Sequence, residues 1–259
     1  MKKIAITLGI IVLVGGYYFY KGSINKNINK ATHHSKYTSS EYKDNDHSDK
    51  YSTVDGVSFN KGYDGNYNRA AVEKANKEYS KVTLNKEFQV DGKRSVEGAV
   101  NCTYVRDVDG DTLIFRKQNS EGQAIGKNTS MRFWGIDTPE DVNPKLKKLI
   151  EPFSLQSVEY VKSKLKEGST IKILFNKSKG KYGRDVGTVY YENNGEWYNL
   201  NLEEVANGLA RIAYLKQNNS TIDTKEYYKA ENSAKEQKLN IWSIQGYTTK
   251  LGYNLAIFK

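Results

Sequence analysis

Five short runs of β-branched and aromatic residues, separated by turn signals, limit what this chain can fold into after residue 95. The runs lie at residues 96–107, 112–117, 130–136, 170–175 and 186–192. Asp109-Gly110 separates the first two runs, and Asn193-Asn194-Gly195 follows the last. Both sequences favour tight hairpin turns. Five short strands joined in this way predict a small closed β-barrel.

Three helical patterns interleave with these strands or follow them, at residues 153–166, 200–207 and 223–238. The third opens with Asp223 and Glu226, which are spaced like the two members of a capping box. A further short helix is predicted at residues 68–80. Because the helices are few and short beside five strands, we expect an α+β fold.

The charge of the chain indicates the kind of partner. Of its 259 residues, 40 are Lys or Arg and 30 are Asp or Glu, which gives a net charge of +10. A basic chain favours partners that carry negative charge, such as nucleic acid or an anionic membrane surface. For a nucleic-acid partner, a five-stranded OB-type barrel with three helices is the expected architecture. Cys102 is the only cysteine, so an intrachain disulfide and an all-cysteine zinc site are excluded.

The N-terminus predicts a membrane segment followed by a polar linker. Lys2 and Lys3 precede residues 4–20, an uncharged and largely apolar run at the short limit for spanning a bilayer. We therefore interpret residues 1–20 as a signal or anchor segment, and the polar residues 21–95 as a flexible linker. An uncleaved anchor that holds the following domain outside the cytoplasmic membrane is expected. The alternative is cleavage and secretion.

Two acidic clusters are the candidate metal site. Asp109-Gly110-Asp111-Thr112 lies at the turn between the first two strands, and Asp137-Thr138-Pro139-Glu140 follows the third. Each alone is also compatible with an ordinary turn or strand exit. Together they place carboxylates at the ends of neighbouring strands. Oxygen ligands without cysteine or histidine favour Ca²⁺ or Mg²⁺ over zinc.

Two arginines complete the candidate site. Arg132 lies on the strand that leads into Asp137, and a spacing of five places the two side chains on opposite faces of a regular strand. A bulge or a bend near Gly135 would bring them together. Arg184 ends a tight turn before the fifth strand. The planar guanidinium suits bidentate binding of phosphate, although isolated arginines are common on the surface of a basic protein.

Five motifs follow one another along the chain: Asp-Gly-Asp-Thr at 109–112, Arg132 five residues before Asp-Thr-Pro-Glu at 137–140, Lys-Tyr-Gly-Arg at 181–184, Gly-Leu-Ala at 208–210 followed by Ala213-Tyr214, and Leu-Asn-Ile-Trp-Ser at 239–243. In these motifs and their order the sequence resembles the thermonuclease, or staphylococcal-nuclease-like, family over residues 96–245. The family fold is an OB-type barrel with three helices, in agreement with the strand count. The resemblance implies a nuclease domain at residues 96–246.

The resemblance also implies a metal site and a catalytic carboxylate. Asp111 and Asp137 would bind Ca²⁺ through their carboxylates, and Thr138 through its backbone carbonyl. Asp109 would support these ligands without binding the metal. Glu140 would orient or deprotonate the attacking water.

The remaining implied roles concern the substrate. Arg132 and Arg184, which with Glu140 are the predicted catalytic residues, would grip the scissile phosphate and its developing charge. Lys181 and Tyr182 would contact a terminal phosphate, and Tyr214 would pack on a base. The implied activity is Ca²⁺-dependent cleavage of DNA and RNA by a monomer, with little sequence preference and 3′-phosphate products.

Several residues depart from the family pattern. The hairpin at residues 117–129 is longer than usual, Lys216 replaces a tyrosine, and residues 153–156 lack the usual helix start. Residues 247–259 extend beyond the resemblance, and no role is predicted for them. Two rival interpretations are a nucleic-acid-binding module without catalysis and a membrane-tethered module that binds protein or oligosaccharide.

Overall fold

The computed structural model describes residues 52–54, 57–59, 67–141, 149–180, 183–215 and 223–259, which belong to one compact unit, Asp49–Lys259. Within these residues, no helix combines the length and the apolar character needed to cross a membrane. The predicted anchor at residues 4–20 lies outside the described residues and stays a prediction, and so does the linker up to residue 51. The hairpin of β1 (Ser52–Val54) and β2 (Val57–Phe59) is antiparallel.

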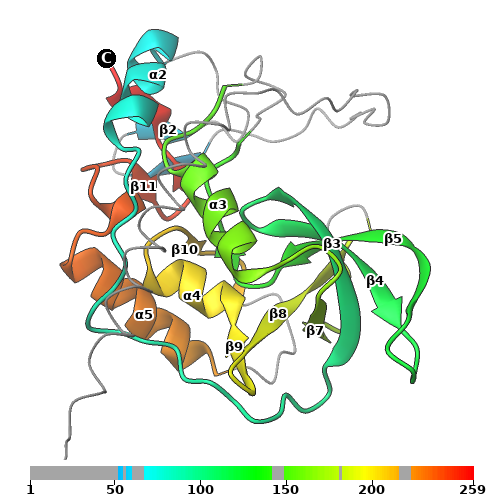
Figure 1. Ribbon diagram of the computed structural model, residues 1–259. Helices are drawn as coiled ribbons and strands as arrows, with labels where there is room; N and C mark the ends of the chain where they lie inside the picture. Colours follow the sequence, from blue (N-terminus) through cyan, green and yellow to red (C-terminus); the bar gives the residue numbers. More distant parts are fainter. Residues whose placement is uncertain (1–51, 55–56, 60–66, 142–148, 181–182, 216–222) are drawn as a thin grey trace, which may run out of the picture. The chain divides into compact units, whose positions relative to one another are not determined.

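A closed β-barrel makes up one side of this unit, at the right in Figure 1. Its strands are β3 (Val100–Asp109), β4 (Thr112–Gln118), β5 (Ala124–Phe133), β7 (Thr170–Phe175) and β8 (Asp185–Asn193). They pair antiparallel in the order β5-β4-β3-β7-β8. A parallel pairing of β5 with β8, in which Met131 lies opposite Asp185, closes the barrel. The predicted five-stranded OB-type barrel is confirmed.

Two strand segments differ from the prediction. β5 begins at Ala124, several residues before the predicted start, because the polar residues that follow continue the pairing with β4 as far as Gln118 opposite Ala124. Residues 124–129 of the long hairpin at residues 117–129 therefore belong to β5. A short strand, β9 (Glu196–Asn199), follows the predicted Asn193-Asn194-Gly195 turn and pairs with β8. Its four residues are too few for an alternating pattern to be read from the sequence.

Three helices, α3 (Ser154–Lys164), α4 (Leu200–Ala206) and α5 (Thr224–Glu236), lie where the sequence predicts them. The Asn199 side chain caps α4 by accepting the Leu202 N–H, and Asp223 caps α5 by accepting the Lys225 N–H. Figure 1 shows the three helices on one side of the barrel, with α4 between β8 and α5. Apolar side chains of the barrel and these helices form the main core.

A second hydrophobic cluster, here called the C-terminal cluster, lies outside the barrel. Its buried members come from four parts of the chain: Val72, Leu149, Phe153, Ile241, Ile244, Tyr247, Tyr253 and Leu255. Val72 belongs to α2 (Arg69–Glu78), which confirms the short helix predicted at residues 68–80. Ile241 belongs to η4 (Asn240–Trp242), and Leu255 belongs to η5 (Leu255–Ile257). Helix α2 and the C-terminal residues thus share one core.

Parts of residues 67–95, assigned by sequence to the linker, pack against the rest of the unit, with Val72, Ala75 and Asn85 buried. The Asn76 side chain donates to the Ile150 carbonyl at 2.6 Å. Asn85 is buried and donates to the Ala206 carbonyl at 2.7 Å, and its backbone N–H donates to Asn207 at 2.9 Å. The packed structure therefore begins N-terminal to the boundary predicted at residue 96.

Candidate active site

The first acidic cluster is the two-residue turn between β3 and β4. Asp109 lies opposite Thr112, and its carboxylate accepts the Asp111 N–H at 3.1 Å. Asp111 itself is 1% exposed, and its Oδ1 accepts the Thr112 hydroxyl at 3.3 Å. The hairpin turn therefore buries the Asp111 carboxylate and holds Asp111 by one hydrogen bond to its backbone N–H and one to its carboxylate.

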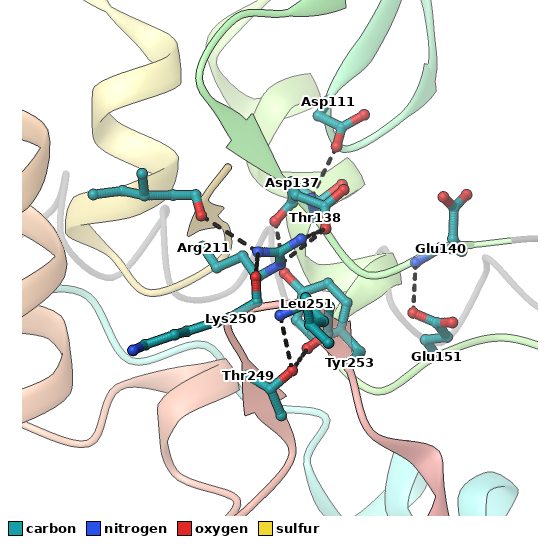
Figure 2. Close-up of polar contacts among 12 residues, drawn as sticks. Asp111, Asp137, Thr138, Glu140, Glu151, Arg211, Thr249, Lys250, Leu251 and Tyr253 are labelled. Atoms are coloured by element: carbon teal, nitrogen blue, oxygen red, sulfur yellow. Dashed lines mark hydrogen bonds and ion pairs between the residues drawn. The ribbon is translucent and has the colours of Figure 1, made fainter. Parts of the chain in front are cut away.

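The second acidic cluster meets the first. It begins on β6 (Ile136–Asp137), and the Thr138 N–H donates to Asp111 Oδ2 at 2.9 Å. The structure thus brings the Asp111 carboxylate to the Thr138 N–H, next to Asp137, whereas the predicted metal role of the Thr138 carbonyl stays a prediction (Figure 2).

Arg132 connects the two carboxylates. Its Nη1 lies 2.6 Å from Asp111 Oδ1, and its Nη2 lies 2.7 Å from Asp137 Oδ1. The bend that this arrangement needs is present, because Gly135 has a φ of 77°, in the left-handed region that glycine adopts readily. The predicted correction of the Arg132–Asp137 spacing near Gly135 is confirmed.

Arg211 is a second cationic partner of Asp137 that the sequence analysis did not identify. It lies on β10 (Arg211–Ile212), directly opposite Asp137 on β6. Its Nη2 and Nε lie 2.8 and 3.0 Å from Asp137 Oδ2. The available signal was an arginine in the middle of the apolar run Leu209-Ala210-Arg211-Ile212-Ala213, since a buried arginine needs an anionic partner.

Glu140 lies at the edge of the acidic site, on a backbone that Glu151 holds in place. The Glu140 N–H donates to the buried Glu151 carboxylate at 3.0 Å, and the Glu151 N–H donates to the Glu140 carbonyl at 3.0 Å (Figure 2). Burial, and then the Asp111 carboxylate, raises the pKa of Glu140 to about 7. Glu151 was also missed, since one glutamate before a proline carries no distinctive signal.

The donor chemistry of this site fits a hard divalent cation. Burial raises the pKa of Asp111 well above its ordinary value, and Asp109 and Asp137 add to the effect while Arg132 opposes it. Four carboxyl groups, on Asp109, Asp111, Asp137 and Glu140, lie near enough to Arg132 to raise its pKa. Carboxylate oxygens are donors that suit Ca²⁺. In the described part of the chain, no group of three or more His, Cys, Asp or Glu side chains is placed so that it could hold a metal ion.

The predicted substrate-binding residues are only partly described. Arg184 directly precedes β8, whose first residue lies opposite Met131, so the barrel closure places it beside the strand that carries Arg132. The Nε of Arg184 is buried and has no hydrogen-bond partner among the described residues. Tyr214 is 57% exposed, just beyond β10. Lys181 and Tyr182 lie outside the described residues.

Gly110 is required by close packing at the acidic turn. An added Cβ would lie 2.1 Å from Ser157 Oγ, 2.7 Å from Ser157 Cβ and 3.0 Å from Thr138 Oγ1. Gly110→Ala is therefore expected to lower the free energy of unfolding by about 1–3 kcal/mol, measured by denaturant titration. Ser157→Gly removes the two nearest atoms but also the hydrogen bond that the Ser157 hydroxyl donates to the buried Glu204 carboxylate at 2.8 Å, so it is destabilising by itself. The double variant should nevertheless lose less stability than the two single variants lose together. If the double variant loses as much unfolding free energy as the two single variants lose together, the packing explanation is contradicted.

Comparison with known proteins agrees with this geometry. Residues 130–244 match the family described as "Staphylococcal nuclease homologue". The chain is 33% identical over 160 residues to Endonuclease YncB of Bacillus subtilis (strain 168), a match that covers 60% of this chain and 67% of YncB. It is 34% identical over 158 residues to the SPbeta prophage-derived endonuclease YokF of the same organism, covering 60% of this chain and only 48% of YokF.

A third relative is the Thermonuclease of Staphylococcus hyicus, 30% identical over 140 residues, which are 54% of this chain and 73% of the relative. The family match includes Arg132, Asp137, Glu140, Arg184 and Tyr214, whereas the turn that carries Asp111 precedes it. The contacts of Asp111 with Arg132 and Thr138 join that turn to the matched region. Barrel, site and sequence matches together place this chain in the staphylococcal nuclease family.

Proposed function

We propose that this chain is a Ca²⁺-dependent nuclease that hydrolyses phosphodiester bonds of DNA and RNA with little sequence preference and leaves 3′-phosphate ends. The observation that carries the proposal is the convergence of Asp111 and Asp137 on Arg132, beside Glu140. Membership of the family, and the nuclease names of its relatives, support the same reaction class.

The cation would be held by the carboxylates of Asp111 and Asp137 and the backbone carbonyl of Thr138, with Asp109 fixing the turn. Bound Ca²⁺ would supply positive charge against the phosphate as negative charge develops on its oxygens. The buried setting of Asp111 makes this charge more effective than it would be in water, because the surroundings screen it less.

Glu140 would orient the attacking water and accept its proton. A general base works best when its pKa lies near the operating pH, and burial brings the pKa of Glu140 to about 7 in the metal-free protein. Its backbone is held in both directions by Glu151, so the carboxylate starts from a defined position.

Arg132 and Arg184 would bind the phosphate oxygens. The planar fork of an arginine matches two oxygens at once, and Arg184 offers a buried Nε that has no partner among the residues the structure describes. Tyr214 is exposed enough to stack on a base, and stacking tolerates any base. Lys181 and Tyr182 are proposed to bind a terminal phosphate, and the protein is proposed to act as a monomer.

Nuclease activity is expected to require Ca²⁺ and to be supported poorly by Mg²⁺, because a site with few protein ligands suits the loose coordination of Ca²⁺ better than the strict octahedron of Mg²⁺. The measurement is digestion of single- and double-stranded DNA and of RNA with Ca²⁺, Mg²⁺ or EDTA. Undiminished digestion in EDTA would refute the metal role. Binding of DNA without any cleavage in Ca²⁺ would instead favour a pure binding module.

We also propose that the nuclease works outside the cytoplasmic membrane, anchored by residues 4–20. The support is the uncharged apolar run behind two lysines. Sequencing the N-terminus of the protein from the membrane fraction and from the medium tests this. An intact N-terminus in the membrane fraction supports the anchor, and a shortened one in the medium supports cleavage and secretion. Activity that stays protected from protease in intact cells would refute both.

A further inference from the structure

The last residues of the chain reach the acidic site. They form a small hairpin of β11 (Thr248–Thr249) and β12 (Gly252–Tyr253), beyond the family match that ends at residue 244. The Thr249 hydroxyl ties the turn by donating to the Gly252 carbonyl at 2.9 Å and accepting the Leu251 N–H at 3.2 Å. Figure 2 shows this hairpin beside Arg211 and Asp137.

One hydrogen bond connects the hairpin to Asp137, and a second connects it to Arg211, the ion-pair partner of Asp137. The Tyr253 hydroxyl donates to the Asp137 backbone carbonyl at 2.6 Å. The Lys250 carbonyl accepts from Arg211 Nη1 at 3.2 Å, and Arg211 holds the Asp137 carboxylate through Nη2 and Nε. The hairpin therefore fixes the main chain of Asp137 directly and its side chain through one arginine.

The hairpin itself is firmly anchored. Tyr253 is 8% exposed and belongs to the C-terminal cluster, where its ring centroid lies 5.1 Å from that of Tyr247. The Asn254 N–H donates to the Tyr247 carbonyl at 2.7 Å. Because α2 packs into the same cluster through Val72, the position of Tyr253 depends on parts of the chain that lie outside the barrel.

We propose that the hairpin Thr248–Tyr253 is a positioning element of the cation site, and that the Tyr253 hydroxyl sets the orientation of Asp137 for binding Ca²⁺. This inference rests on the proposed function, since it concerns the same cation. A ligand whose peptide is held on one side by Tyr253 and whose carboxylate is held by Arg211 has little freedom left to lose when it binds a cation. Partners of this kind, which contact the ligand and not the ion, commonly change metal affinity strongly.

The test is Tyr253→Phe, which removes one hydroxyl and keeps the ring in the cluster. Tyr227→Phe is the matched control: Tyr227 is also buried, and its hydroxyl hydrogen-bonds to the Asn199 side chain, accepting from the amide nitrogen at 3.3 Å and donating to Oδ1 at 3.4 Å, instead of to Asp137. Calcium affinity is measured by isothermal titration calorimetry with CaCl₂ alone, the melting temperature is measured without metal, and turnover is measured at low and at saturating Ca²⁺.

Tyr253→Phe is expected to weaken Ca²⁺ binding roughly 10-fold, to lower turnover at low Ca²⁺, and to recover most of it at saturating Ca²⁺. Tyr227→Phe should keep the wild-type affinity even if its melting temperature falls. Unchanged affinity in Tyr253→Phe, or equal loss in both variants, would overturn the positioning role while leaving the nuclease proposal intact. Absence of Ca²⁺ binding by the wild-type chain would refute the cation site, and the proposed function with it.

Discussion

Replacing Glu140 by glutamine is expected to lower turnover by about 10²–10⁴-fold, the usual contribution of a positioned general base. The substitution keeps the shape of the side chain and removes only its charge. The two backbone hydrogen bonds between Glu140 and Glu151 do not involve the Glu140 side chain, so the loop should stay in place. Initial rates of DNA hydrolysis at saturating Ca²⁺ measure the effect.

Glu121→Gln is the control for this substitution. Glu121 is exposed in the turn between β4 and β5, and its backbone N–H, which donates to Asn119, is unaffected by the change. The melting temperatures of both variants should lie close to that of the wild type. A Glu140→Gln variant that turns over at a near-normal rate would show that this carboxylate is not the base.

The features that sequence could predict are those with a local physical cause. Asp109-Gly110 favours a hairpin turn wherever it stands, and Asp223 caps α5 because its side chain reaches a nearby N–H. The meeting of the two acidic clusters also followed from strand order, since both lie at strand ends. The turn and the helix cap therefore lie where the sequence predicts them.

The features that sequence could not predict depend on contacts between distant parts of the chain. Residues 67–95 have few aliphatic side chains and so resemble a linker, but Asn85 is held by hydrogen bonds to the α4 end and α5, more than by apolar burial. The partner of Arg211 is known only once β10 is paired with β6. The hairpin of β11 and β12 has two residues per strand, too short for any periodic pattern.

The structure also changes what is expected of Arg132. A surface arginine could be removed without harm to folding, but this one connects Asp111, which is 1% exposed, to Asp137. Arg132→Ala leaves the Asp111 carboxylate buried without its cation. We expect the free energy of unfolding of the metal-free protein to fall by about 3–5 kcal/mol, the usual effect of removing one member of a buried ion pair. Turnover should fall by about 10²–10³-fold through loss of charge stabilisation at the phosphate.

Calcium distinguishes this explanation from a general packing defect. If Arg132 and Ca²⁺ share the oxygens of Asp111 and Asp137, the cation no longer competes with a guanidinium in Arg132→Ala. Calcium should then bind the variant more tightly and raise its melting temperature by more than that of the wild type, because a ligand stabilises the folded state according to its affinity. Arg116→Ala is the matched control, since Arg116 lies on β4 and donates to the carbonyls of Gly126 and Ala124. Equal calcium shifts in wild type, Arg132→Ala and Arg116→Ala would mean that the arginine and the cation do not share these carboxylates.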